Sequence, residues 1–170
     1  IEATKQLMNH KGIALVLATG GSGMVKSAYS TGKPALGVGP GNVPSYIEKT
    51  AHIKRAVNDI IGSKTFDNGM ICASEQVVVI DKEIYKDVTN EFKAHQAYFV
   101  KKDELQRLEN AIMNEQKTGI KPDIVGKSAV EIAELAGIPV LENTKLIIAE
   151  ISGVGSDYPL SREKLSPVLA

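Results

Sequence analysis

Two patterns of apolar residues alternate along this chain. Short, largely apolar runs, which are typical of buried strands, occur at residues 13–18, 35–38, 77–80 and 146–151. Between them lie longer stretches in which apolar residues recur every three or four positions, as they do on one face of a helix. Strands that alternate with helices are typical of layered α/β folds, so we predict an α/β protein with a largely parallel sheet.

The helical stretches carry recognisable end signals. Inward-facing apolar positions predict helices within residues 24–29, 53–61, 84–92 and 105–112. Asp81 is expected to cap the third of these helices. Ser128 and Glu131 form a capping-box pattern for a short further helix, and Gly137 is expected to close it.

Glycines follow the first two predicted strands. Gly20, Gly21 and Gly23 lie where a strand meets a helix N-terminus, a place where backbone can approach an anion closely. Their spacing does not match the Gly-x-Gly-x-x-Gly dinucleotide pattern, and a plain tight turn would explain them equally well. A second glycine-rich loop spans residues 37–42.

Charge and length exclude several classes of protein. Twenty Lys and Arg residues balance 20 Asp and Glu residues, which argues against binding to nucleic acid or to an anionic membrane. A chain of 170 residues can form one domain or slightly more. Without a signal-like segment or a membrane-length apolar run, a cytoplasmic protein is expected. The start at Ile1, without a methionine, favours a fragment of a longer protein.

Cys72 is the single cysteine and the strongest candidate for chemistry. A lone cysteine is most often an inert buried side chain. Here, however, the polar turn Asp67-Asn68-Gly69 leads into it and the small residues Ala73 and Ser74 follow, so a substrate could reach the sulfur. This setting predicts an accessible nucleophilic thiol on a turn that comes after the helix at 53–61.

Four segments of the sequence resemble the aldehyde dehydrogenase superfamily. They are residues 18–26, 37–42, 65–76 and 163–167. The chain is similar to the CoA-acylating branch, in particular to the aldehyde dehydrogenase half of the bifunctional aldehyde-alcohol dehydrogenases of fermenting bacteria. The resemblance implies a layered αβα aldehyde-dehydrogenase-like fold, with residues 1–45 in the nicotinamide-cofactor-binding domain and residues 46–170 in an incomplete catalytic domain.

The resemblance also implies a reaction. Cys72 would attack acetaldehyde or a similar short aldehyde, hydride would pass to NAD, and CoA would take the acyl group from the resulting thioester. The positions that the resemblance assigns to cofactor binding are Thr19, Gly20, Gly21, Gly37, Gly39 and Glu163. Leu165 and Ser166 replace the Phe and Gly of the family's Glu-x-Phe-Gly-Pro pattern, which leaves the backbone geometry there open.

Two alternatives remain beside this reading. Hydrolytic relatives carry a glutamate near the second glycine loop that activates water, whereas this chain has no acid between Pro34 and Tyr46. That difference favours CoA over water, although a hydrolytic NAD(P)-dependent enzyme is one alternative. The other is a non-catalytic filament or interaction fragment. We expect the intact parent to be a homo-oligomer or a filament, and the isolated fragment to be inactive.

Metal chemistry is not predicted. His10, His52 and His95 are scattered and lack the spacing of metal ligands.

Overall fold

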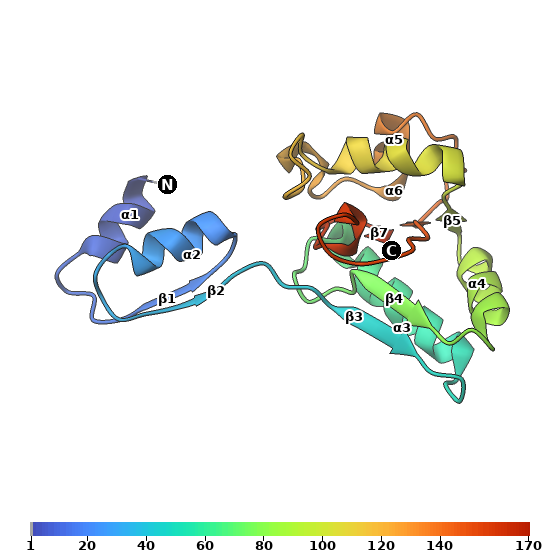
Figure 1. Ribbon diagram of the computed structural model, residues 1–170, viewed down its shortest axis with the longest axis horizontal. Helices are drawn as coiled ribbons and strands as arrows, with labels where there is room; N and C mark the ends of the chain where they lie inside the picture. The colour runs from blue at the N-terminus through green and yellow to red at the C-terminus, as the bar shows by residue number, and fades with distance from the viewer. Residues whose placement is uncertain (1) are drawn as a thin grey trace. The chain divides into compact units, whose positions relative to one another are not determined.

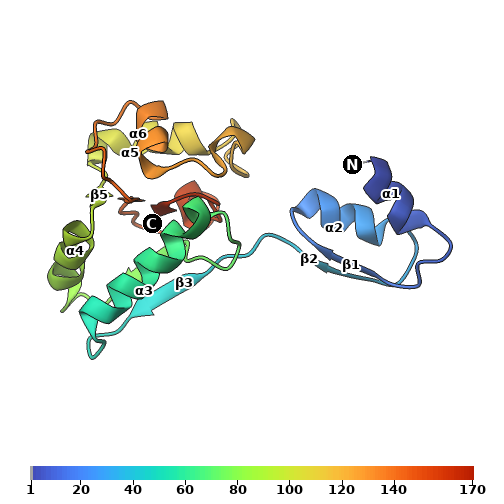
Figure 2. The same cartoon turned by 180° about the vertical axis from the view of Figure 1, so that it is seen from behind.

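The computed structural model describes residues 2–170 and divides into two compact units, one ending at Gly41 and the other running from Asn42 to Ala170. The first unit contains α1 (Glu2–Asn9), β1 (Val16–Thr19), α2 (Ser22–Tyr29) and β2 (Ala35–Val38). Strands β1 and β2 pair in parallel, and both views show the two helices on one side of this pair (Figures 1 and 2). Met8, Val16, Ala18 and Ala28 form the small core between them.

The second unit holds the remaining elements. Its strands are β3 (Pro44–Ile47), β4 (Val77–Ile80), β5 (Ala97–Phe99), β6 (Leu146–Ile148) and β7 (Val168–Leu169). Its α-helices are α3 (Ile53–Thr65), α4 (Tyr85–Ala94), α5 (Lys102–Ile112) and α6 (Ala129–Leu135). Three short 3₁₀ helices connect them: η1 (Phe66–Gly69), η2 (Pro122–Ile124) and η3 (Pro159–Ser161). Within the described residues, none of the helices is both long and apolar enough to cross a membrane.

All strand pairs in the second unit are parallel. Strand β3 pairs with β4, and β6 lies between β5 and β7. The end of β7 is joined to the start of β4, because Val78 N donates to Ala170 O at 2.8 Å and Ala170 N donates to Gln76 O at 3.1 Å. The strands therefore follow one another in the order β5, β6, β7, β4, β3. Gln76, directly before β4, bonds the chain on both sides, Val43 before β3 and Ala170 after β7.

Helices cover both faces of these strands, as the alternation of strand side chains demonstrates. Ile147 and Val168 are buried with α5 and α6, whereas Leu146, Ile148 and Leu169 are buried with α3 and α4. Successive residues of a strand point to opposite faces, so two separate cores flank the strands. Figure 1 shows α5 and α6 on one side and α3 on the other. The predicted layered α/β fold with parallel pairing is confirmed.

All five predicted helices are present, but one predicted cap is wrong. Ser128 N donates to the Glu131 carboxylate at 2.8 Å and Glu131 N donates to Ser128 Oγ at 3.3 Å, which is the predicted capping box. Gly137 takes a left-handed φ of +64° after α6. Asp81 does not cap α4, which begins at Tyr85. It closes an earlier turn by accepting a bond from Glu83 N at 3.2 Å.

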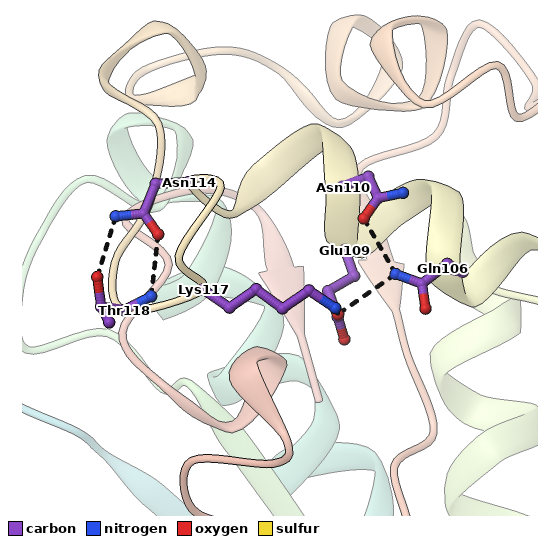
Figure 3. A network of polar contacts seen from close by, with 6 residues as sticks. All are labelled: Gln106, Glu109, Asn110, Asn114, Lys117 and Thr118. Carbon is purple, nitrogen blue, oxygen red and sulfur yellow. Dashed lines mark hydrogen bonds and ion pairs between the residues drawn. The ribbon is translucent and has the colours of Figure 1, made fainter.

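A polar turn links α5 to η2 (Figure 3). Asn114 Oδ1 accepts a hydrogen bond from Thr118 N at 2.9 Å, and Asn114 Nδ2 donates to Thr118 Oγ1 at 3.2 Å. Lys117 reaches back to form an ion pair with Glu109 on α5, whose carboxylate also accepts a bond from Gln106 Nε2 at 3.4 Å. These side-chain contacts give the turn a fixed conformation without a hydrophobic core of its own.

Candidate active site

Cys72 is exposed, as the sequence predicts. It lies in a turn of residues 71–74, here called the Cys72 turn, which is closed by a hydrogen bond of 3.0 Å from Ser74 N to Ile71 O. Ala73 beside it is also exposed, whereas Ser74 is buried. The turn therefore presents the sulfur to solvent while its last residue is anchored in the protein interior.

The approach to this turn is fixed by three successive residues with left-handed backbone. Asp67, Asn68 and Gly69 have φ values of 49°, 50° and 70°. Asn and Asp adopt this conformation more readily than other residues with a side chain. Asn68 Nδ2 also donates to Gly126 O at 2.8 Å. At Gly69 a Cβ atom would lie 2.6 Å from Ser166 O, so the position requires glycine.

Gly69 therefore brings residues 163–167, here called the Glu163 segment, against the base of the Cys72 turn. Within this segment the left-handed residue is Leu165, with a φ of +43°, and Ser166 has no positive φ. Serine in place of the family's glycine is thus compatible with the backbone. Burial raises the pKa of the Glu163 carboxyl, and the nearby Lys64 ammonium partly offsets that shift.

Two lysines are buried beside these segments, and sequence reasoning missed both. Lys64 on the last turn of α3 and Lys164 have side chains with no exposed surface. Lys64 Nζ donates to Gln76 Oε1 at 3.1 Å. Burial lowers the pKa of Lys64 to about 8, and the carboxylates of Glu75 and Glu163 partly offset this effect. A lysine at position 64 continues the inward-facing spacing of α3, which was the available sequence signal.

Lys164 is held by backbone carbonyls. Its Nζ donates to Leu160 O at 2.7 Å and to Gln76 O and Arg162 O at 2.9 Å each. Burial lowers the pKa of Lys164 well below its usual value, and the charge on Lys64 lowers it further. Three carbonyl acceptors nevertheless match the three hydrogens of an ammonium group, so we assign the charged form to Lys164.

The first unit carries all the glycines predicted to bind a cofactor. Parallel pairing of β1 and β2 places Thr19 and Gly39 at the same edge, where both strands end, and Gly20 N donates to Val38 O at 3.0 Å. Gly21 caps α2 with extended backbone. Within the described residues, a Cβ atom on Gly21 or Gly39 would have no neighbour within 4 Å. This edge is therefore open to a ligand, as nucleotide-binding edges of parallel sheets are.

Gly37 has a different explanation. A Cβ atom there would lie 2.6 Å from Val25 Cγ1 and 2.8 Å from the Tyr29 ring. Gly37 N also donates to Tyr29 Oη at 3.0 Å. Packing of α2 against β2 is sufficient to require glycine at this position.

Contacts within the second unit thus join the segments that carry Cys72 and Glu163, through Gly69 beside Ser166 and through Gln76, which bonds Ser74 and Lys164. Thr19, Gly20, Gly21, Gly37 and Gly39 belong to the first unit.

Comparison with known proteins identifies the family. Residues 1–124 match the aldehyde dehydrogenase family model. An aldehyde-alcohol dehydrogenase of Streptococcus pneumoniae is 55% identical over 177 residues, covering 100% of this chain and 20% of that protein. The chain thus spans about a fifth of the length of such curated relatives.

Solved structures agree in fold. An acetylating aldehyde dehydrogenase from Geobacillus thermoglucosidasius matches with a TM-score of 0.93 and 51% identity, over 99% of this chain and 37% of that chain. A Rhodopseudomonas palustris propionaldehyde dehydrogenase with bound CoA and an acylated cysteine matches with a TM-score of 0.86 and 33% identity, over 99% of this chain and 38% of that chain. This chain belongs to the aldehyde dehydrogenase family.

Proposed function

We propose that the protein carrying this chain is a CoA-acylating, nicotinamide-dependent aldehyde dehydrogenase. It interconverts a short-chain aldehyde plus CoA and the corresponding acyl-CoA, with acetaldehyde as the first candidate. The observation that carries this proposal is the exposed Cys72 thiol on a turn that Gly69 fixes against the Glu163 segment. The likeness to a structure that holds CoA and an acylated cysteine supports it.

Cys72 performs the covalent chemistry in this proposal. Its thiolate attacks the aldehyde carbonyl carbon and forms a C–S bond, giving a thiohemiacetal. When that carbon loses hydride and the oxygen loses its proton, a thioester remains on the sulfur. The CoA thiolate then attacks the thioester carbonyl and releases the Cys72 thiolate. The small, exposed Ala73 leaves room for both nucleophile and acyl group.

A nicotinamide cofactor supplies the hydride acceptor when it is bound. We assign its binding to the open edge formed by Thr19, Gly20, Gly21 and Gly39, and the nicotinamide ribose to the Glu163 carboxylate. The lack of side-chain neighbours at Gly21 and Gly39 within the described residues fits a closely approaching ligand. Gly37 contributes by packing. In this proposal residues 1–45 belong to the cofactor-binding domain and residues 46–170 to the catalytic domain.

The acyl acceptor in this proposal is CoA rather than water. The segment from Pro34 to Tyr46, which includes β2 and the loop into β3, contains no acid that could activate water. A thiol is the better nucleophile and needs less help from a base. The hydrolytic alternative is therefore not favoured. We also propose that the protein is a homo-oligomer and acts in the cytoplasm. The reducing environment there keeps Cys72 as a free thiol and prevents disulfide formation.

A first prediction concerns the requirement for CoA. In the product of the complete reading frame that encodes this chain, NADH formation from acetaldehyde and NAD⁺ should rise at least about tenfold when CoA is added, because CoA deacylates Cys72. Acetyl-CoA should form in proportion to NADH. Equal rates without CoA, with acetate as the product, would identify a hydrolytic enzyme instead.

A second prediction concerns Glu163. Glu163→Gln should slow hydride transfer by roughly tenfold to a hundredfold, because a hydrogen bond to a charged partner contributes about 1.5–3 kcal/mol. The dissociation constant of NAD⁺ should change less, since the variant keeps the rest of the dinucleotide site. Stopped-flow measurement of the NADH burst tests this. Glu134→Gln, on the exposed side of α6, is the matched control. A normal burst in Glu163→Gln would make Glu163 a surface acid.

A further inference from the structure

Gln76 follows Cys72 by four residues, directly precedes β4 and is completely buried. Its backbone is bound on both sides. Gln76 N donates to Val43 O at 2.9 Å, while Gln76 O accepts from Lys164 Nζ at 2.9 Å and from Ala170 N at 3.1 Å. The residue therefore has a fixed position at the start of β4.

The side-chain amide of Gln76 joins the end of α3, the Cys72 turn and the Glu163 segment. Oε1 accepts from Lys64 Nζ at 3.1 Å and from Lys164 N at 2.9 Å, and Nε2 donates to Ser74 O at 3.2 Å. Lysine ammonium and backbone N–H groups only donate, and a carbonyl only accepts. The amide can therefore satisfy all three partners in one orientation. If it were flipped, its NH₂ group would face the Lys64 and Lys164 donors and its oxygen would face the Ser74 carbonyl.

Two of these partners lie within two positions of a residue of the proposed site. Ser74 ends the Cys72 turn, and Lys164 directly follows Glu163. A single amide thus links the segments that carry the nucleophile and the proposed ribose-binding acid, and its third partner is the Lys64 ammonium, whose charge partly offsets the rise that burial causes in the pKa of Glu163. An unpaired polar group would be costly here, because the amide has no access to water.

We propose that Gln76 is a positioning residue: its side-chain amide holds the Cys72 turn and the Glu163 segment in one fixed geometry, the donor end through Ser74 and the acceptor end through Lys164. This inference rests on the proposed function for its kinetic consequences, but the link between the amide and the thiol is independent of the reaction. The two ends of the amide are separable by substitution, because glutamate keeps the acceptor and loses the donor.

The experiment compares Gln76→Glu with Gln76→Met in the product of the complete reading frame. In Gln76→Glu the acceptor contacts to Lys64 and Lys164 remain, whereas an oxygen faces Ser74 O. The NADH burst should fall at least fivefold while the KM for NAD⁺ stays within about twofold of the wild type. Gln76→Met has a similar volume but lacks both ends, so the burst should fall further and the KM should rise severalfold.

A readout without cofactor or substrate separates this inference from the proposed function. The rate of Cys72 alkylation by iodoacetamide, followed by mass spectrometry of its peptide, should change at least threefold in both variants, because both release Ser74 O. Thr89→Val is the matched control, since it removes a buried hydroxyl that bonds Lys86 O within α4. It should leave the alkylation rate and both kinetic constants unchanged.

The alkylation rates and the kinetic constants together decide whether Gln76 has a positioning role. Wild-type alkylation rates in both variants, or equal losses in both variants and in Thr89→Val, would overturn the positioning role. If Gln76→Met does not fold, Gln76→Glu decides alone, since it retains volume and two of three contacts. If the wild type forms no acetyl-CoA but alkylation still responds to Gln76, the proposed function fails and the positioning role stands.

Discussion

Replacing Cys72 with alanine should abolish aldehyde oxidation and the reverse reduction of acyl-CoA together. Both directions pass through the same thioester on the Cys72 sulfur, so neither reaction can proceed when the sulfur is removed. Loss of a nucleophile of this kind lowers turnover by at least about a thousandfold. Folding should be unaffected, because the Cys72 side chain is exposed.

The measurement is turnover in both directions, with the melting temperature as the test of folding. Cys72→Ser is the matched variant, since it keeps the size and a hydroxyl but supplies a much weaker nucleophile at neutral pH. It should bind NAD⁺ as the wild type does and show no burst of NADH. If Cys72→Ala retains a tenth of the activity in either direction, the thiol has no part in the mechanism.

The sequence was sufficient to predict the layered fold because the fold depends on local patterns. The apolar run at 77–80 and the helical spacing at 53–61 each indicate an element without knowledge of its neighbours, and both elements are present as β4 and α3. Short elements were missed for the same reason. β7 has two residues, Val168 and Leu169, and is defined by its pairing with β6, which no local pattern reveals.

The polar interior of the site could not be predicted in this way. Gln76 and Lys164 have the sequence features of surface residues, and only the helical spacing of α3 indicates that Lys64 faces inward. The burial of all three depends on contacts between positions up to 88 residues apart. The resemblance assigned Gly37 to the cofactor, and the structure adds a packing reason for this glycine, against Val25 and Tyr29, that no local pattern shows. A glycine in a sequence indicates that a Cβ atom is not tolerated at that position, but it does not show which neighbouring atoms exclude it.

The accessibility of Cys72 was a local property and was predicted correctly. The polar residues before it and the small residues after it describe its immediate surroundings, which are the turn itself. The reason for the adjacent glycine was not local. Gly69 has a left-handed φ of +70°, and the Ser166 carbonyl that it contacts comes from the other end of the second unit. This contact has a measurable consequence.

Gly69→Ala should destabilise the protein and reduce its activity more than alanine at any other glycine of the second unit. A Cβ atom would lie 2.6 Å from Ser166 O, 2.7 Å from Ser166 C and 2.9 Å from Lys64 O. All three are backbone atoms, which cannot rotate away. A left-handed residue with a Cβ costs about 1–2 kcal/mol, and overpacking adds about 1–3 kcal/mol.

Gly62→Ala is the matched control, because Gly62 lies on the exposed side of α3 and, within the described residues, its added Cβ would meet no atom within 4 Å outside the helix backbone. It should stabilise the helix by about 0.5–1 kcal/mol. The melting temperature and the NADH burst per folded molecule should therefore both fall in Gly69→Ala. Neither should fall in Gly62→Ala. If both variants have the melting temperature of the wild type, the contact between Gly69 and Ser166 does not hold the Cys72 turn in place.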